Sequence, residues 1–412
     1  MFIGQLFICI YVILLTICIA KAPLDSTIVF AKGEGGYYCH KIPYLLTTSD
    51  NTLIAFAEAR GKDGREACDD FSGTDLVTKR SIDGGITWST LALFYSNSTG
   101  DDVNIIGNAA PVVDTSTGRI WVPFCKNNEE IYISYSDDDG MTWSNPNPQP
   151  QLVHEEWYWV GMGPPAGLQL SSGRLLIPSY HTNKFKGDGC ASRGHIVYSD
   201  DHGLTWEIGS DSFGEPYFAN ECQAVELESN DKGGVIMINA RTISRHRLQI
   251  LSYDGGITFE PPVLIDTLQQ TIEGCEGSII ADHTDIDGNI TPIPTLYFSN
   301  PNNDGVIRRN MTISKSIDNG ITWNVYKTID RGAVSYSALQ MYTSTSINTN
   351  ISNNNSDITN GMSTTTTTAP NTTPTAPITA PNTKYLTLLY ERSNTMQMIF
   401  EPDEIVFYKI PI

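Results

Sequence analysis

The octapeptide Ser81-Ile82-Asp83-Gly84-Gly85-Ile86-Thr87-Trp88 sets a pattern of Ser, Asp, Gly, Thr and an aromatic residue that returns along the chain. Asp accepts hydrogen bonds from nearby backbone amides, Gly adopts positive φ, and the aromatic ring can be buried against a sheet. The pattern therefore predicts a tight turn with a hydrophobic plug. Four further copies start at Ser136, Ser199, Ser252 and Ser316, so the five starts lie 55, 63, 53 and 64 residues apart.

Runs of β-branched and aromatic residues precede these turns, for example at residues 130–135 and 194–198, and they predict β-strands. A repeat of this length is too long for a solenoid coil and fits a four-stranded propeller blade with its loops. About six such units follow Ile28. We therefore predict an all-β fold, a six-bladed β-propeller in which one blade lacks the octapeptide pattern. Because the pattern recurs whereas an active site need occur only once, we expect these turns to be structural.

The first 22 residues are expected to lie outside this fold. Residues 6–20 are apolar and uncharged, and Ala20-Lys21-Ala22 offers small residues for cleavage, so we predict a secretory signal peptide at 1–22. No Lys or Arg precedes the apolar run, which leaves an uncleaved membrane anchor as the alternative. No later segment is apolar enough to span a membrane. The expected location is secreted or lysosomal, with no membrane span after signal removal.

Cysteines and N-glycosylation sequons fit an exported protein. Removal of the signal leaves six of the eight cysteines in about 390 residues, too few for the fold to depend on disulfides. They are Cys39, Cys68, Cys125, Cys190, Cys222 and Cys275. Sequons occur at Asn97, Asn289, Asn310, Asn350, Asn354 and Asn371.

The formal net charge of −20 argues against nucleic acid and anionic membrane surfaces as partners. It does not exclude an anionic small ligand, because a few convergent Arg and Lys side chains can reverse the field locally and form short-range bidentate bonds.

One internal stretch differs from the rest in composition. Residues 344–383 are mostly Ser, Thr, Asn and Pro, with little to bury, so we predict a disordered insert within a single propeller domain at 23–412. Strand patterning resumes at residues 385–390 and 404–408. We expect the last of these strands to pair with the strand at 27–30, because closing the ring in this way removes two open sheet edges.

Several ordered stretches between the repeats resemble the exo-α-sialidases (neuraminidases) with Asp-box, or BNR, repeats. The resemblance covers about 340 residues. The stretches that carry it are His40-Lys41-Ile42-Pro43, residues 53–60, 75–81 and 118–124, Asn220-Glu221-Cys222-Gln223, Asn239-Ala240-Arg241 and Ser335-Tyr336-Ser337-Ala338-Leu339. It implies a retaining glycoside hydrolase that releases terminal α-linked sialic acids from glycoproteins, glycolipids or oligosaccharides, with no cofactor and no metal.

The same resemblance implies three catalytic residues. Tyr336 matches the nucleophile and Glu221 the base that activates it. A neutral phenol suits this chemistry, because the anomeric carbon of a sialoside carries a carboxylate that repels an anionic nucleophile. Asp70, eleven residues before the first repeat, matches the acid/base; Asp63, Asp69 and Asp75 remain alternatives, since the acidic loop between residues 61 and 74 can shift the match.

Substrate-binding residues follow from the resemblance as well. Arg241 matches the second member of an arginine trio that binds the substrate carboxylate, and Arg308 the third, with Arg309 as the alternative if the strand register slips by one. The first member is Lys41 here, which keeps the charge but loses the bidentate fork of Arg. Glu391 matches the acid that orients this first basic residue, and the remaining pocket residues are Arg60 and Glu58.

Cys39 and Cys68 flank Lys41 and Asp70 in sequence, and we expect a disulfide between them that ties the acid/base loop to the first inner strand. Two other functions fit the same residues: a lectin-like propeller that binds an acidic sugar without cleaving it, and an intramolecular trans-sialidase. The pairing of Tyr336 with Glu221 favours an enzyme over a lectin, because binding alone needs no nucleophile.

Overall fold

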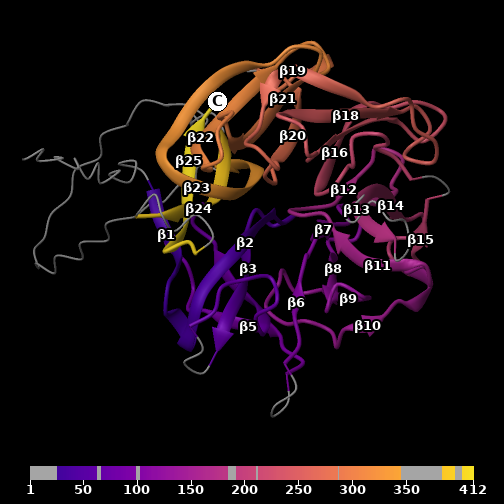
Figure 1. Cartoon of the computed structure of the whole chain (residues 1–412). Coiled ribbons are helices and arrows are strands. Elements are labelled where there is room, and N and C mark those ends of the chain that lie inside the picture. Colours follow the sequence, from indigo (N-terminus) through magenta and orange to yellow (C-terminus); the bar gives the residue numbers. More distant parts are fainter. Residues whose placement is uncertain are drawn as a thin grey trace, which may run out of the picture.

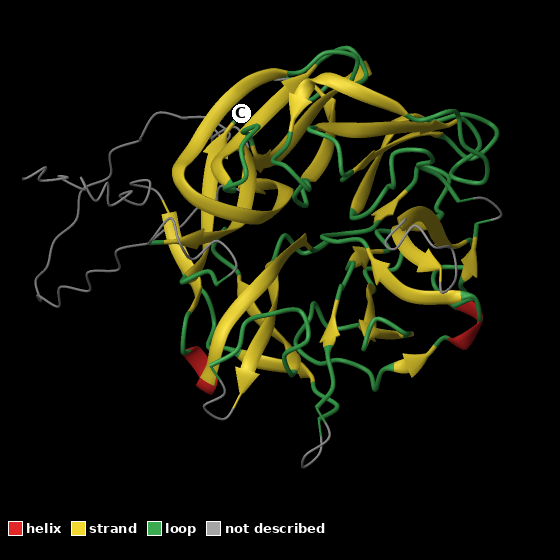
Figure 2. Cartoon of the chain, in the orientation of Figure 1, coloured by secondary structure: helices red, strands yellow, loops and turns green. Residues whose placement is uncertain are grey.

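The computed structural model describes residues 26–62, 66–98, 103–183, 192–209, 212–285, 287–344, 383–394 and 401–412. The chain forms antiparallel sheets arranged in a ring (Figure 1). Strands account for nearly all of the regular structure, together with two short 3-10 turns, η1 (Glu34–Gly36) and η2 (Pro150–Leu152) (Figure 2). In the described part of the chain, no helix has the length and apolarity needed to cross a bilayer.

Six four-stranded units follow one another round the ring, as the sequence predicted. Blade 1 contains β2 (Tyr37–Thr47), β3 (Leu53–Lys62), β4 (Thr74–Ser81) and β5 (Ala92–Tyr95). Blade 2 contains β6 (Ile106–Gly107), β7 (Val112–Val113), β8 (Ile120–Lys126), β9 (Glu130–Ser136) and β10 (Asn147–Pro148); β6 and β7 are two pieces of one inner strand. Blade 3 contains β11 (Trp157–Met162), β12 (Leu168–Gln169), β13 (Leu175–Asn183), β14 (Ser192–Ser199) and β15 (Glu207–Ile208), again with a divided inner strand. Blade 4 contains β16 (Cys222–Glu228), β17 (Val235–Ala240), β18 (His246–Ser252) and β19 (Val263–Gln269).

Blades 5 and 6 share one long strand. β20 (Ser278–Thr284), β21 (Ile290–Pro301) and β22 (Arg309–Ser316) are joined by the first half of β23 (Asn324–Ser344) to form blade 5. The second half of β23 pairs with β24 (Thr383–Ser393), β25 (Glu404–Pro411) and β1 (Ser26–Ala31) to form blade 6. The predicted closure of the ring is confirmed, because β1 pairs with β25 from Ser26↔Tyr408 to Ala31↔Glu404.

The five octapeptide repeats, called Asp boxes from here on, form the turns between the third and fourth strands of blades 1 to 5. In every box the Ser hydroxyl accepts a hydrogen bond from the N–H of the last glycine at 2.8 to 3.0 Å. The Asp carboxylate accepts a hydrogen bond from the Thr N–H at 2.8 to 2.9 Å. Gly85, at φ 86°, lies so close to Phe407 of blade 6 that a Cβ there would stand 2.1 Å from its ring. The first box therefore also packs one blade against the next.

The core of the described chain is divided among six hydrophobic clusters, each shared by two neighbouring blades. Phe56 of blade 1 and Phe124 of blade 2 lie in one cluster, and Trp121 of blade 2 packs against Trp206 of blade 3 in the next. Apolar burial of this kind holds the ring together without a single central core.

The inner strands all run in the same direction. Their far ends line a cavity of about 920 Å³, contributed by blades 1 to 6 and including Leu46, Val113, Glu226, Ala281 and Met341. The residues expected to form the active site lie near the opposite ends of the same strands. None of them hydrogen-bonds to an Asp-box residue in the described chain, which agrees with a structural role for the boxes.

The predicted signal peptide at 1–22 lies outside the described residues, and so does the predicted insert except for its two ends. Those ends are neighbours: Ser344 of β23 pairs with Thr383 of β24. The insert therefore connects two adjacent antiparallel strands of blade 6.

Candidate active site

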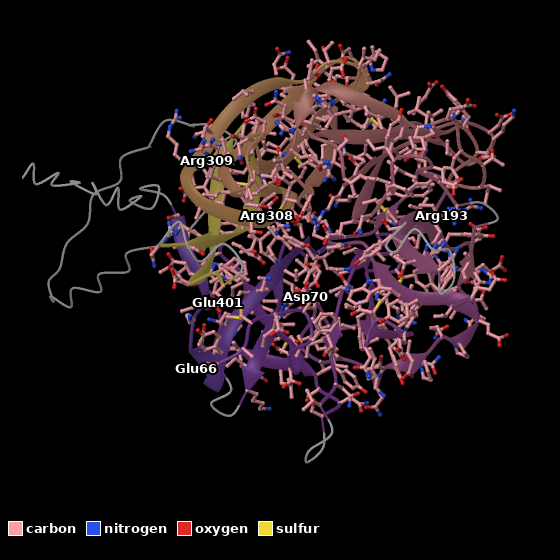
Figure 3. The ribbon with its side chains drawn as sticks, viewed as in Figure 1. Glu66, Asp70, Arg193, Arg308, Arg309 and Glu401 are labelled. Atoms are coloured by element: carbon pink, nitrogen blue, oxygen red, sulfur yellow. A yellow bond between two sulfur atoms is a disulfide. The ribbon has the colours of Figure 1, made fainter. Side chains whose placement is uncertain are left out.

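Residues from four of the six blades gather near the starting ends of the inner strands. Tyr336 lies on β23 and Lys41 on β2, while Glu221 directly precedes β16, Arg241 follows β17 and Arg308 precedes β22. Figure 3 shows Asp70 and Arg308 near the middle of the ring, with Arg309 farther out.

Tyr336 and Glu221, the predicted nucleophile and base, are in direct contact. The Tyr336 hydroxyl donates a short hydrogen bond to Glu221 Oε1. Arg241 Nη1 donates to Glu221 Oε2 at 2.8 Å and to the Tyr336 oxygen at 3.3 Å. Since Tyr336 lies on β23, Glu221 just before β16 and Arg241 just after β17, the fold brings together a phenol, a carboxylate and a guanidinium from three separate segments.

The protonation of this group follows from its surroundings. Burial, and then the negative charge of Glu221, raise the pKa of Tyr336 well above its ordinary value, although Arg241 and Arg308 oppose the shift. Burial lowers the pKa of Arg241, but Glu221, Tyr336 and Cys275 together raise it above its ordinary value, so the guanidinium stays charged. The phenol is therefore neutral and its proton is directed at Glu221, the arrangement in which a carboxylate can remove that proton during attack.

Arg308 is held beside Tyr336. Its Nη1 donates to Ser335 Oγ at 3.0 Å and its Nη2 to the Gly274 carbonyl at 3.3 Å, and its guanidinium carbon lies 5.5 Å from the centre of the Tyr336 ring. Arg309 is exposed on β22, opposite Ala333. Of the two arginines left open by the sequence, the structure places Arg308 in the site.

A second group surrounds Arg60 of β3. Arg60 Nη2 lies 2.5 Å from Glu58 Oε2, and Nη1 donates to Asp70 Oδ1 at 2.8 Å and to the Cys68 carbonyl at 3.1 Å. Glu58 also accepts hydrogen bonds from the Tyr44 hydroxyl at 3.0 Å and the Asn108 N–H at 2.9 Å. Both Arg60 and Glu58 are fully engaged, so they hold the loop that carries Asp70.

Asp70 is the acid of this loop that faces the site. Its side chain is 66% exposed, and its pKa is raised by burial but lowered by more by the positive charges of Arg60, Lys41 and Arg308. Asp69 instead accepts from the Phe71 N–H within its own loop at 2.8 Å, and Asp75 is buried against the Tyr37 hydroxyl at 2.7 Å. Asp63 lies outside the described residues.

Lys41 is buried, with 8% of its surface exposed, and its ammonium makes no hydrogen bond or ion pair with the described residues. Burial and the charge of Arg60 lower its pKa, while Glu391 and Asp70 act against that shift. The structure does not pair Lys41 directly with Glu391, which instead accepts the Ile42 N–H at 2.8 Å. Ile42 has φ 50°, a strained value for a β-branched residue, so Glu391 holds the backbone beside Lys41.

The expected disulfide is present. Cys39 of β2 is bonded to Cys68 of the Asp70 loop, with their Cα atoms 6.0 Å apart. It ties this loop to the strand that carries Lys41. Three other described cysteines are free and buried: Cys125, Cys222 and Cys275.

Sequence reasoning missed several residues of the site. Tyr180 is buried, and burial and the nearby charge of Glu221 raise its pKa well above the ordinary value. Trp159 Nε1 donates to its hydroxyl at 3.3 Å. Ser335 holds Arg308, and Glu276 bonds to the backbone next to Tyr336. An acid within the small-residue run Gly274-Cys275-Glu276-Gly277-Ser278 was the signal available for Glu276.

The fold and the site together define a six-bladed propeller in which basic side chains surround a tyrosine that is hydrogen-bonded to a carboxylate. The family model described as BNR repeat-like domain matches residues 51–348. Sialidase-3 of Mus musculus is 30% identical over 285 residues, which cover 62% of this chain and 66% of that protein. Sialidase-4 of Mus musculus is 30% identical over 282 residues, which cover 62% and 56%. The match thus spans less than two thirds of the length of either relative.

Solved structures show the same fold. The Hadza microbial sialidase Hz136 has a TM-score of 0.71 at 24% identity, covering 94% of this chain and 68% of that one. The intramolecular trans-sialidase from Ruminococcus gnavus has a TM-score of 0.67 at 18% identity, covering 95% and 99%. The chain belongs to the exo-α-sialidase family with BNR repeats, as the resemblance in its sequence predicted.

Proposed function

We propose that this protein is a retaining exo-α-sialidase that hydrolyses terminal α-linked sialic acids of glycoproteins, glycolipids or oligosaccharides. The observation that carries the proposal is the hydrogen bond from the Tyr336 hydroxyl to Glu221, beside the two arginines Arg241 and Arg308. A lectin needs the basic groups to bind an acidic sugar, but it needs neither a nucleophile nor a base.

The first half of the reaction uses all three proposed catalytic residues. Lys41, Arg241 and Arg308 bind the substrate carboxylate. The Tyr336 oxygen attacks the anomeric carbon as Glu221 takes its proton, a C–O bond to tyrosine forms, and the bond to the leaving oxygen breaks as Asp70 donates a proton to it.

The second half reverses these roles. Water attacks the anomeric carbon, Asp70 removes a proton from that water, the bond to Tyr336 breaks, and Glu221 returns the proton to the tyrosine oxygen. Two displacements at one carbon retain its configuration.

Asp70 must carry a proton at the moment of cleavage, although three nearby cations lower its pKa in the free protein. The incoming carboxylate neutralises part of that positive charge, so the pKa of Asp70 rises when substrate binds. Substrate binding therefore prepares the acid, and leaving-group protonation depends on a bound carboxylate.

The proposal can be tested by measuring the hydrolysis of a fluorogenic aryl sialoside by the wild-type protein and by Tyr336→Phe. Wild type should release the fluorophore, whereas Tyr336→Phe, which keeps the ring but lacks the nucleophilic oxygen, should lose at least 100-fold in kcat. Proton NMR of the early product should show the α-anomer of free sialic acid. Binding without turnover would support the lectin, and an internal anhydro sugar as product would support the intramolecular trans-sialidase.

We also propose that the protein is secreted or lysosomal, on the basis of the apolar segment at residues 6–20. Expression of the full chain in a eukaryotic cell, followed by N-terminal sequencing, tests this. The mature chain should start near Pro23, and an intact Met1 on membrane-bound protein would support the anchor instead.

A further inference from the structure

Strand β23 contains a β-bulge at the proposed nucleophile. Val334 pairs with Arg392 and Ser337 with Tyr390, so Ser335 and Tyr336 together face the single residue Glu391 of β24. A bulge of this kind interrupts the ladder and redirects a side chain. The direction of the Tyr336 side chain thus depends on whatever fixes the backbone at the bulge.

Glu276 contacts this backbone directly. It lies just before β20 in blade 5, and its Oε2 accepts the Ser337 N–H at 2.8 Å. The side chain is 1% exposed, and its Oε1 has no hydrogen-bond partner among the described residues. Buried polar atoms are nearly always paired, so a half-satisfied carboxyl is costly and is not explained by stability alone.

Charged neighbours surround Glu276 without forming an ion pair with it. Burial raises its pKa well above the ordinary value, Glu221 and Glu391 add to this, and the Ser337 N–H and Arg247 oppose it. Arg247 is itself buried and donates to the Cys275 carbonyl at 2.6 Å, one residue before Glu276. Arg247 therefore fixes the backbone next to Glu276. This keeps the Glu276 carboxyl in position to accept the Ser337 N–H.

The same device appears at Lys41. Strand β2 has a bulge between Lys41 and Tyr44, and the buried Glu391 accepts the Ile42 N–H there. The described residues thus contain two inner-strand bulges beside site residues, each held through a backbone N–H by a buried glutamate from another segment of the chain. Glu391 holds the bulge next to Lys41, which is proposed to bind substrate, and Glu276 holds the bulge that contains Tyr336, which is proposed to react.

We propose that Glu276 is a positioning residue that fixes the direction of Tyr336 through the Ser337 amide. The proposal rests on the function proposed for Tyr336. It makes the bulge, and not the hydrogen bond to Glu221 alone, responsible for presenting the phenol oxygen to the anomeric carbon. A displacement of about 1 Å of a reacting group can cost on the order of 100-fold in rate, so loss of the Glu276 contact should act mainly on kcat.

The test compares Glu276→Ala, Glu276→Asp and Glu276→Gln with a matched control, Glu226→Ala. Glu226 is also a buried glutamate, with 9% of its surface exposed and one carboxylate oxygen without a partner among the described residues. Its other oxygen accepts a hydrogen bond from the Ser171 N–H at 2.8 Å, which joins blade 4 to blade 3. It lines the cavity at the far ends of the inner strands. The two alanine variants should lose similar thermal stability, which separates structural cost from positioning.

Glu276→Ala should lower kcat on an aryl sialoside by about 10- to 100-fold with KM within threefold. The affinity for an unsaturated sialic acid inhibitor, measured by calorimetry, should stay within threefold because Lys41, Arg241 and Arg308 remain. Glu276→Gln keeps an oxygen that accepts the Ser337 N–H and should restore kcat to within about threefold. Glu276→Asp, one methylene shorter, should fall between them and provides the measurement if the alanine variant does not fold.

Three results would overturn the inference: unchanged kcat in Glu276→Ala, or in Glu276→Asp where alanine does not fold; an equal loss of kcat in Glu226→Ala; or failure of Glu276→Gln to rescue. Each leaves the sialidase function standing if wild type turns over. Absence of turnover by wild type on every sialoside would overturn both proposals together.

Discussion

Lys41 stands where the resemblance in the sequence implies an arginine, and the structure gives this difference a physical meaning. An ammonium that is buried and unpaired among the described residues is costly unless an anion arrives to neutralise it. Arg308 and Arg60 add positive charge around it. Three cationic side chains thus lie together where a carboxylate is proposed to bind, in a chain whose net charge is −20.

We predict that Lys41→Met lowers kcat/KM on sialosides at least tenfold, about 1.4 kcal/mol, because it keeps the stem and deletes the charge. Lys41→Arg should restore a bidentate contact and lower KM, provided the larger planar group fits beside Arg60 and Arg308. Steady-state kinetics on a sialoside panel measures both. A panel on which Lys41→Met is never the weakest of the three forms would show that Lys41 does not bind the carboxylate.

Asp70→Asn should damage substrates with poor leaving groups far more than aryl sialosides, since an aryl alcohol departs without help from an acid. The expected loss in kcat is about 10²- to 10⁴-fold on a sialyl-lactose substrate and less than tenfold on the aryl glycoside. Asp69→Asn is the matched control, because Asp69 bonds within its own loop. Equal losses on both substrates would move the acid/base role to another carboxyl.

At the scale of the element, the Asp boxes stabilise the blades through short hydrogen bonds. In the second box, the Thr142 hydroxyl and N–H hold the pKa of Asp138 at about 2. Because the folded pKa lies below the ordinary value of about 3.9, the stabilisation is present above pH 4 and is lost as the pH falls toward 2.

Asp138→Ala should accordingly lower the free energy of unfolding at pH 7 by about 1 to 2 kcal/mol, while kcat/KM stays within twofold. Thermal unfolding of wild type and variant across pH 2 to 7 measures the effect. The difference between the two melting temperatures should shrink below pH 4. A difference that stays constant down to pH 2, or a large loss of activity, would contradict the role given to the box.

These elements also show how far the sequence alone could lead. The boxes are local, since all their bonds fall within five residues, so the pattern predicted the turns and the number of blades. Arg308 and Arg309 could not be separated, because neighbouring residues of a strand face opposite sides and the register depends on distant pairing. Glu276 escaped notice for the same reason: its partner, Ser337, is 61 residues away.

The long strand β23 was missed as well. The part of β23 before Ala333 pairs with β22, and the part after it pairs with β24. No turn separates the two parts, so the sequence around Gly332 and Ala333 contained no turn signal that could reveal the change of partner. The sequence predicted the strand that closes the ring, because the ends of a propeller chain must cover an open edge. The closing strand could thus be predicted from the sequence, whereas the change of pairing partner within β23 could not.

At the scale of the whole molecule, the six blades form one closed ring, and the closing strand β1 and the insert between β23 and β24 occupy different places in it. Strand β1 buries Val29 and Phe30 and pairs with β25. Residues 345–382 connect Ser344 to Thr383, which are already paired neighbours. The physical difference is that β1 completes a sheet edge, whereas the insert only joins two chain ends that the sheet holds together.

We therefore predict that replacing residues 345–382 with a two-residue Gly-Ser or Asn-Gly turn leaves kcat/KM within twofold and the melting temperature no lower than that of wild type. Loop-closure entropy favours the short connection, by about 0.6 kcal/mol for each halving of the loop, and two-residue turns of this composition suit antiparallel strands. Calorimetry and sialoside kinetics on purified protein measure both quantities. The contrasting variant lacks residues 26–31 and should fail to accumulate as folded protein, because β25 is then an open edge. A drop of more than 5 °C in the insert deletion, or a stable and active protein without β1, would show that closure of the ring depends on the insert and not on the terminal strand.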